Sequence, residues 1–337
     1  MLKRIISSFA ISLLLASCLT KAATAEESLI FATTIPANMN VNVDVFHPWA
    51  ERINKAAHGV VRIETRDGPT IANGSNFYDR VLSDVVQIGW GLMGSIGGKF
   101  QRSTVVSLPF EVDEARSGST AFWRLYKSGF LDEDFKDIVP LILLALPQNA
   151  LHLRTAPNKI SDLRGLRLAS ATKIGTEAIA RVGASPMSLT TADFYESLQR
   201  NMIDGVVTPY TAVGPFKLFE VTSYSVDTAF GGSQAFIFMS RKRYEALSTE
   251  ARKAIDDNSG EKESAAWGAY WDKLEEDGRQ IFRSDPKKTL VMPTIEQTAI
   301  WRSDVVPVTD EWVKTTPNGG KILEGYRTLL KQAKSGK

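Results

Sequence analysis

The chain has 337 residues, with 40 lysines and arginines against 38 aspartates and glutamates, a formal net charge of +2. Its first 25 residues hold three of the basic groups and no acidic one, so the remainder carries 37 basic and 38 acidic groups, a net charge of −1. A near-neutral chain has no overall attraction for nucleic acid or an anionic membrane. The composition, 43% hydrophobic and 23% charged, is typical of a folded globule, and the length predicts about two domains.

Cysteine and histidine are too few to suggest a metal site or a disulfide framework. The only cysteine is Cys18, and the three histidines (His47, His58 and His152) are widely spaced. Structural zinc usually needs four such ligands at characteristic spacings. We therefore expect no metal.

The first 25 residues have the regions of a secretory signal peptide. A basic start at positions 3 and 4 precedes the apolar run 5–19, and Ala23-Thr24-Ala25 offers a small-x-small cleavage pattern. The apolar run is shorter than the ~20 residues that span a bilayer. We expect export to the periplasm with cleavage after Ala25. Because Leu15-Ala16-Ser17-Cys18 resembles a lipobox, acylation of Cys18 is the alternative.

Beyond the leader, the first half of the chain alternates between strand and helix patterns. Apolar β-branched runs predict strands, and apolar residues four apart predict helices. The predicted strands are 29–33, 60–65, 85–90 and 139–146, and the predicted helices are 46–57, 76–83 and 119–126. This alternation is typical of a parallel sheet covered by helices.

The same pattern restarts after Ala150. The predicted strands are 166–170, 186–189, 206–208 and 235–240, the predicted helices are 174–182 and 193–201, and a long helical stretch follows at 249–282. No linker separates the two units, which favours several chain crossings. The sequence therefore predicts an α/β fold with two lobes and a long helix spanning them.

One glycine-rich segment matches a nucleotide-binding motif but not its context. Residues 89–94 read G-x-G-x-x-G, yet poor helix formers follow and the segment comes after the third predicted strand, not the first. We interpret it as a loop at a cleft, because open α/β sheets bind ligands at the carboxyl ends of their strands.

No nucleophile–base pair suggests catalysis. Ser95 lacks the G-x-S-x-G context, since residue 93 is Met, and His152 lies between Leu151 and Leu153 in a strand-like stretch. We interpret His152 as structural and expect no enzyme activity. A secreted α/β enzyme and a scaffold protein are the alternatives from other classes.

Three aromatic residues are candidates for a ligand pocket: Trp90, Tyr210 and Phe230. Burial in the core is the competing interpretation for each, because aromatic side chains bury large areas. Trp90 is favoured because it ends a predicted strand between two glycines.

Three segments in order resemble a known family. They read DLRGLRL at 162–168, VGASP at 182–186 and YESLQRNMIDG at 195–205, with support from LPF at 108–110 and from 240–248. The chain resembles, from about residue 29 to 312, the periplasmic solute-binding subunit of tripartite ATP-independent periplasmic (TRAP) transporters of the dicarboxylate type.

The resemblance implies a two-lobed fold like that of type II periplasmic binding proteins. We expect lobe I to hold 26–147 and 234–273, and lobe II to hold 148–233 and 274–337. It also implies capture of a small organic acid between the lobes, without a cofactor, and its delivery to membrane permease subunits that use an ion gradient.

The family usually supplies a ligand-binding arginine at the end of a G-L-K-I-R strand. Here that strand reads GLRLA and ends in Ala169. Arg167 lies on the same strand face, about 6–7 Å back. It and Arg154 are candidate charge donors, and a surface role is the alternative for each.

The other matching pocket positions carry no charge. They are Thr34, Leu92, Thr191 and Thr208, with Trp90, Gly91, Tyr210, Phe230 and Gln234 nearby. Such a pocket suits a neutral, cationic or aromatic solute at least as well as a dicarboxylate. A Trp90/Tyr210 cage, holding a cation by cation–π contact, is the second hypothesis for the ligand.

Overall fold

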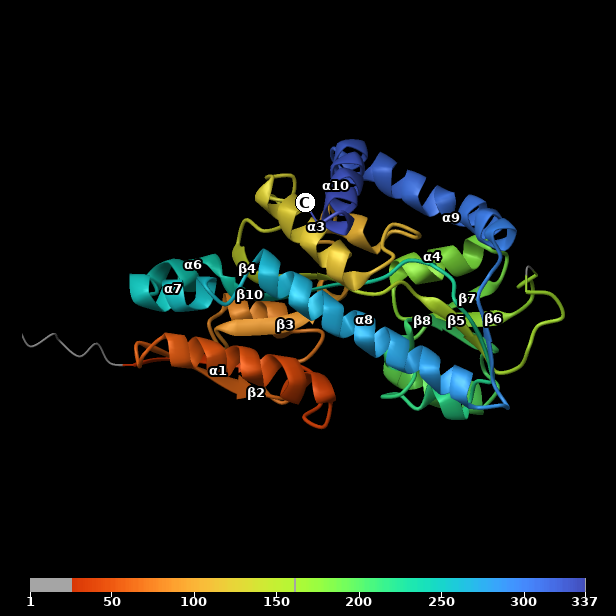
Figure 1. The fold of residues 1–337 in the computed structure, drawn as a ribbon, viewed down its shortest axis with the longest axis horizontal. Helices are drawn as coiled ribbons and strands as arrows, with labels where there is room; N and C mark the ends of the chain where they lie inside the picture. The colour runs from red at the N-terminus through yellow and green to blue at the C-terminus, as the bar shows by residue number, and fades with distance from the viewer. Residues whose placement is uncertain (1–25, 161, 337) are drawn as a thin grey trace, which may run out of the picture.

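The computed structural model describes residues 26–160 and 162–336, and Figure 1 shows them as two α/β lobes side by side. The predicted two-lobed α/β class, with a long helix across both lobes, is confirmed. The predicted leader, including Cys18 and the cleavage site after Ala25, lies outside the described residues. Among the described helices, none is long and apolar enough to cross a membrane.

Lobe I is built on a five-stranded sheet with the order β2-β1-β3-β10-β4. Its strands are β1 (Glu27–Ala32), β2 (Val61–Arg66), β3 (Ile88–Leu92), β4 (Ile138–Ala145) and β10 (Gln234–Ser240). β1 pairs in parallel with β2 and β3, but β10 is antiparallel to β3 and β4. The sheet is therefore mixed rather than wholly parallel, because β10 returns from the other lobe.

Helices cover both faces of this sheet. They are α1 (His47–Ala56), which follows a π-helical turn at Asn42–Phe46, then α2 (Phe77–Leu82) and α3 (Ala115–Lys127), and later the short α6 (Arg241–Ala246) and α7 (Thr249–Asp256). Trp49 and Ile53, four residues apart on α1, are both buried, as their helical spacing predicts. Separate apolar clusters pack on the two faces, one around Trp49 and the other around Phe236.

Lobe II is built on a six-stranded sheet with the order β11-β9-β5-β8-β6-β7. Its strands are β5 (Ala150–Leu153), β6 (Arg167–Ser170), β7 (Ser185–Ser188), β8 (Gly205–Thr208), β9 (Tyr224–Val226) and β11 (Thr289–Val291), and its helices include α4 (Lys173–Arg181) and α5 (Phe194–Gln199). β6 is parallel to β7 and β8, whereas β5 is antiparallel to β8 and β9.

The long helical stretch predicted at 249–282 is two helices. α7 ends at Asp256, and α8 begins after Gly260, whose φ of +91° is a conformation that favours glycine. α8 (Glu261–Ser284) crosses both lobes, as Figure 1 shows in light blue. Its Trp267 joins the apolar core of lobe I, and its Phe282 joins a cluster in lobe II.

A second helix also bridges the lobes. α9 (Ile295–Thr315) buries Trp301 in the core of lobe II and Trp312 in the core of lobe I. α10 (Gly319–Lys334) then packs on α3, with Ile322 and Tyr326 in the lobe I cluster. The structure thus differs from the predicted boundaries, which placed all of 274–337 in lobe II, because the apolar stripe of α10 covers α3.

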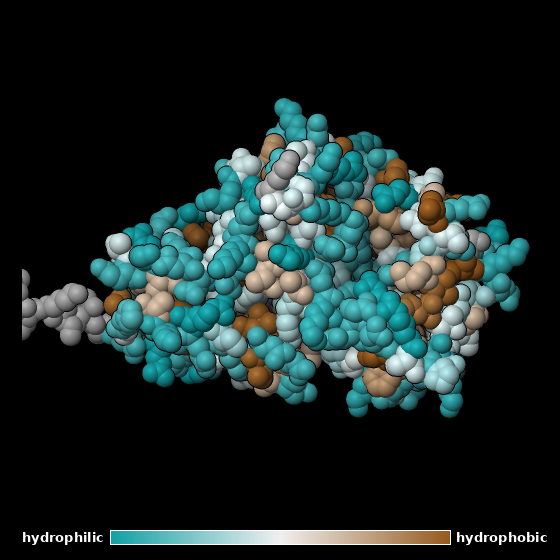
Figure 2. All heavy atoms as spheres, in the orientation of Figure 1, coloured by the Kyte–Doolittle hydropathy of each residue, from teal (hydrophilic) through white to brown (hydrophobic). Residues whose placement is uncertain are grey.

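Two segments, 146–149 and 227–233, connect the sheets and are hydrogen-bonded to each other. The Leu146 amide donates to the Ser233 carbonyl at 2.9 Å. The Gln148 side-chain oxygen accepts from the amides of Phe110, at 3.2 Å, and Gly231, at 3.0 Å. This pair of segments is called the junction below. Figure 2 shows that hydrophilic residues cover most of the visible face, with small apolar patches between them.

Candidate functional site

The carboxyl ends of strands in both sheets meet at the junction. β1 and β3 run parallel to β4, so they end at the edge where β4 leaves for lobe II. Ala150, which opens β5, pairs with Thr208 at the end of β8, so β8 and its parallel neighbour β6 also end beside the junction. We call the residues at and just after the carboxyl ends of β1, β3, β6, β7 and β8 the strand-end edge. In open α/β sheets this edge binds ligands.

On the lobe I side, this edge presents Thr34 and Leu92. Leu92 is 42% exposed, although the four residues before it in β3 are buried. Thr34 adopts a left-handed backbone (φ 56°), and its hydroxyl donates to the Trp90 carbonyl at 3.3 Å. An exposed leucine at the end of a central strand provides an apolar contact surface.

On the lobe II side, the edge presents the first turn of α4. Thr172 caps this helix by accepting from the Gly175 amide at 3.0 Å. Ile174 packs against the apolar core of lobe I, so the helix begins at the interface between the lobes. The Lys173 side chain is 88% exposed and lies 3.7 Å from Glu177. A helix N-terminus with a lysine gives this point positive potential.

The three predicted aromatic residues lie inside the cores. Trp90 packs against Phe46 and Trp271, with ring centroids 5.0 and 5.5 Å away. Tyr210 belongs to an apolar cluster of lobe II, and Phe230 packs on Trp301 at 5.7 Å. Trp90 and Tyr210 therefore belong to different clusters in different lobes, and the structure does not bring them together as a cage.

The glycines beside Trp90 allow close packing of α2 on β3. A Cβ at Gly91 would lie 2.1 Å from the Phe77 ring, and one at Gly89 would lie 2.7 Å from Val81. Two glycines of the motif at 89–94 therefore allow a helix to pack closely on the strand, which their spacing alone does not predict.

Neither candidate charge donor lies at the strand-end edge. Arg167 opens β6, at the far end of the strand, and holds Asp204 in a bidentate pair with contacts of 3.0 and 2.8 Å. Arg154 follows β5 at the same far end, where its amide donates to the Asp204 carbonyl at 3.0 Å. Antiparallel pairing of β5 with β8 carries Arg154 away from the junction.

The remaining predicted residues divide by accessibility. Thr191 is half-buried in a turn after β7. The buried members of the set are Gly91, Ala169, Thr208, Tyr210, Phe230 and Gln234. Ala169 lies in an apolar cluster with Phe194 and Val206. Thr34, Leu92 and Thr191 are therefore the predicted residues that a solute can reach without repacking of the core.

His152 is a fully buried histidine with both ring nitrogens hydrogen-bonded. Nε2 lies 3.1 Å from the Thr208 carbonyl, and Nδ1 lies 3.0 Å from the Ser225 hydroxyl, whose oxygen is 2.8 Å from the Tyr210 hydroxyl. Burial lowers the pKa of His152 to about 4. The neutral imidazole links three strands, in line with a structural role.

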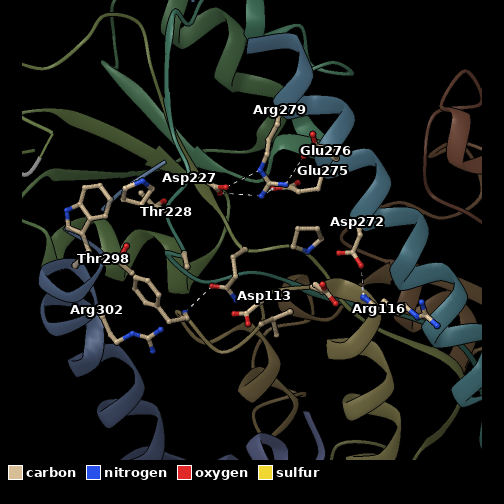
Figure 3. A pocket seen from close by; sticks show the side chains of 18 of the residues that line it. Asp113, Arg116, Asp227, Thr228, Asp272, Glu275, Glu276, Arg279, Thr298 and Arg302 are labelled. Carbon is tan, nitrogen blue, oxygen red and sulfur yellow. Dashed lines mark hydrogen bonds and ion pairs between the residues drawn. The ribbon is translucent and has the colours of Figure 1, made fainter. Parts of the chain in front are cut away.

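A cavity of about 690 Å³ lies between the two spanning helices (Figure 3). Its walls come from 110–116 in lobe I, the junction, the face 269–279 of α8, and residues 293–302 around the start of α9. We call this the helix-side pocket. Of the predicted site residues within the described chain, none lines it.

Carboxylates of α8 in this pocket fix the helix to both lobes. Asp272 accepts from the amides of Ala115 and Arg116 in lobe I, at 2.6 and 2.9 Å. Glu275, only 4% exposed, accepts from the Thr211 amide in lobe II at 3.0 Å. Burial raises the pKa of Asp272, and it raises the pKa of Glu275 to about 8.

Arg279 completes the charged face of α8. It pairs with Asp227 of the junction at 3.1 Å and lies 3.7 Å from Glu275. Asp272, Glu275 and Arg279 are spaced three, four and seven residues apart, so helical periodicity places them on one face. That spacing is the sequence signal that could have indicated this pocket. No cluster of three acidic, histidine or cysteine ligands suited to a metal occurs in the described parts of the chain.

The family model for bacterial extracellular solute-binding proteins, family 7 (DctP), matches residues 31–315. The chain belongs to this family. It is therefore an extracytoplasmic solute-binding protein of the kind that serves TRAP transporters. The predicted resemblance is confirmed.

Individual members of family 7 and its relatives are distant in sequence but similar over most of their length. The outer membrane transporter protein TsaT of Comamonas testosteroni is 24% identical over 325 residues, covering 93% of this chain and 95% of its own. The ectoine/5-hydroxyectoine-binding periplasmic protein UehA of Ruegeria pomeroyi is 20% identical over 280 residues, covering 79% and 78%. A TRAP solute-binding protein of Rhodoferax ferrireducens, solved with copurified benzoate, is 25% identical with a TM-score of 0.83, covering 92% and 99%.

Proposed function

We propose that the solute is an organic acid with one carboxylate and an aromatic or other apolar ring, held at the strand-end edge. The observation that carries this proposal is Ala169, which is buried in an apolar cluster where the family usually has an arginine. Without that guanidinium the edge lacks the bidentate donor that best matches a carboxylate. A solute with two carboxylates would leave one of them poorly compensated.

The first turn of α4 offers a place for the single carboxylate. Lys173 and the helix N-terminus supply positive potential, and Ile174 holds this turn at the interface between lobes. Hydroxyl groups of Thr34 and Thr191 add further hydrogen-bonding capacity. These weaker donors suit one anionic group better than two.

The exposed side chain of Leu92 offers an apolar surface for the ring. Burying apolar area is worth roughly 25 cal/mol per Å², so a six-membered ring contributes substantially to affinity. The Rhodoferax ferrireducens relative was solved with benzoate, an aromatic monocarboxylate of this class. The benzoate bound to that relative supports both the ring and the single carboxylate of the solute that we propose.

A zwitterionic or cationic solute is the second candidate. The relative UehA is an ectoine/5-hydroxyectoine-binding protein, and the absence of an arginine at Ala169 removes a repulsion that such a solute would meet. Because Trp90 and Tyr210 lie in separate cores, this candidate needs contacts other than the predicted aromatic cage.

The remaining elements of the proposal follow from export and family. The mature protein works in the periplasm, with or without acylation of Cys18, delivers its solute to membrane permease subunits, and performs no catalysis. Mass spectrometry of the mature N-terminus tests the first point. Recovery of the bound solute chemically unchanged after prolonged incubation tests the last.

A thermal-shift and calorimetric comparison tests the solute class. The panel is benzoate, succinate and ectoine, added to the mature protein freed of copurified ligand. A ligand at 100 times its Kd stabilises the folded state by about 2.7 kcal/mol. We expect benzoate-type acids to bind and succinate not to. Binding of succinate alone would refute the inference that alanine at position 169 disfavours a solute with two carboxylates. Binding of ectoine alone would favour the zwitterionic candidate.

A further inference from the structure

The helix-side pocket is a partly open cavity that the proposed solute site does not use. Its volume of about 690 Å³ is sufficient for a small organic molecule. Both lobes and both spanning helices contribute to its walls, and it shares no residue with Thr34, Leu92, Lys173 or Thr191 of the strand-end edge. Figure 3 shows the pocket bounded by α8 on one side and α9 on the other.

Carboxylates outnumber guanidinium groups in the lining, although Lys334 pairs with Asp113, and Arg283 with Glu276, from outside it. Six carboxylates and three guanidinium groups line the pocket: Asp113, Glu114, Asp227, Asp272, Glu275 and Glu276 against Arg116, Arg279 and Arg302. Arg279 is paired with Asp227. In Figure 3 the Arg116 side chain extends away from the cavity. Glu114 has no ion-pair partner among the described residues, and Asp272 accepts only backbone amides. The lining thus has carboxylate oxygens without a cation.

The opposite wall is aromatic. Phe110 and Trp301 line the cavity, and the Arg302 guanidinium lies 4.5 Å from the centroid of the Phe110 ring. A guanidinium at this distance from a ring is a cation–π contact. The protein's own side chain therefore shows that this wall accommodates a cation beside an aromatic ring. The pocket combines an acidic side, along α8, with an aromatic side, along α9.

We propose that the helix-side pocket is a second binding site, for a small organic cation that has an ammonium head on an aromatic body, as in an arylalkylamine. The ammonium group lies beside Glu114 and Asp272, where its donors meet carboxylate oxygens. The aromatic body lies along Phe110 and Trp301. This inference is independent of the proposed organic acid, because the two sites use different residues.

Calorimetric titration of 2-phenylethylamine into the full mature protein, with no organic acid present, tests the proposal. Phenylacetate, which has the same body and the opposite charge, is the matched ligand. We expect the amine to bind wild type. Ala269→Phe places a large side chain in the pocket from α8. It should weaken amine binding at least about twentyfold, because the new ring occupies space that the ligand needs and removes the apolar contacts of the ligand. Phenylacetate binding, where present, should persist in this variant.

A charge variant and its control sharpen the result. Glu114→Gln should weaken amine binding about fivefold at low salt, as expected for loss of one exposed charge pair. Glu296→Gln, an exposed carboxylate on α9 outside the lining, should leave amine binding unchanged. If Ala269→Phe does not fold, Thr298→Phe blocks the pocket from the α9 side. The proposal is overturned if the amine does not bind wild type. It is also overturned if the amine binds Ala269→Phe and Thr298→Phe as tightly as it binds wild type. Displacement of the amine by phenylacetate at a single shared site also overturns it.

Discussion

The two regions where the lobes meet are built differently. At the strand-end edge, short loops present a few uncharged side chains, the exposed Leu92, and one lysine at the start of α4. In the helix-side pocket, two long helices face each other across six carboxylates and three guanidinium groups. The first region is accessible and weakly charged, whereas the second is densely charged and held by buried hydrogen bonds.

This difference indicates a division of labour between the two regions. Capture of a solute requires lobes that move relative to each other, and loops at strand ends can absorb such motion. α8 and α9, by contrast, are each anchored in both cores, so they limit how far the lobes separate. Substitutions on the helix side should therefore mainly change stability, and substitutions at the strand ends should mainly change affinity.

The largest loss of stability should come from Trp301→Ala. Trp301 is 2% exposed and anchors α9 in the lobe II core against Phe230. Removing a buried tryptophan costs about 3–5 kcal/mol, because a cavity remains. Chemical denaturation measures this loss. The neighbour Ile300, 45% exposed, is the matched control, and Ile300→Ala should cost less than about 0.5 kcal/mol. Equal effects would mean that α9 is not anchored through Trp301.

Gly278→Ala should also destabilise, although alanine favours helix more than glycine does. A Cβ at Gly278 would lie 2.3 Å from the Tyr210 carbonyl oxygen, so α8 would have to shift away from lobe II. We expect a loss of about 2–3 kcal/mol by denaturation. In the control Gly320→Ala on α10, the new Cβ would meet Val313 at 3.8 Å, an ordinary contact. That variant should be neutral or up to about 1 kcal/mol more stable.

Much of this fold could be predicted from apolar periodicity. The helix at 46–57 and the strand at 60–65 were located to within one or two residues, since Trp49 and Ile53 mark the buried face of one and alternation marks the other. The antiparallel β10 and the placement of α10 on lobe I could not be predicted. Both depend on which partner a segment meets after the chain has crossed between lobes, and local pattern does not contain that information.

The site was harder to predict than the fold for the same reason. Trp90 looked accessible because it ends a strand between glycines, but Phe46 and Trp271, far away in sequence, cover its ring. Arg167 was a candidate charge donor with a surface role as the alternative, and only the direction of β6 and the partner Asp204 show that it lies at the opposite end of the strand. The helix-side pocket is assembled from four separate segments, so the spacing of charged residues on α8 indicates only one of its walls.

Glu275 should make stability depend on pH. Burial raises its pKa from 4.5 to about 8, so the folded protein retains a proton that the unfolded chain releases above its ordinary pKa. The stability this provides is complete below about pH 4.5 and is lost as the pH rises to about 8. Glu275→Gln stays neutral and should remove this loss, a difference on the order of 2 kcal/mol between pH 5 and 8. Denaturation at both pH values, with the exposed Glu324→Gln as control, measures it. An identical pH dependence in wild type and Glu275→Gln would contradict the assignment.

The smallest effect expected is at the strand-end edge, and it is on affinity rather than stability. Lys173→Ala removes one exposed positive charge from the start of α4, which should weaken binding of an aromatic monocarboxylate about three- to fivefold at low salt. The effect should vanish near 1 M salt, where the screening length is about 3 Å. Calorimetry with benzoate measures it, and Lys262→Ala, an exposed lysine near the start of α8, is the control. If Lys173→Ala instead lowered stability as much as the helix-side variants do, the division between a moving edge and a fixed helix side would fail, because α4 would then be part of the rigid connection between the lobes.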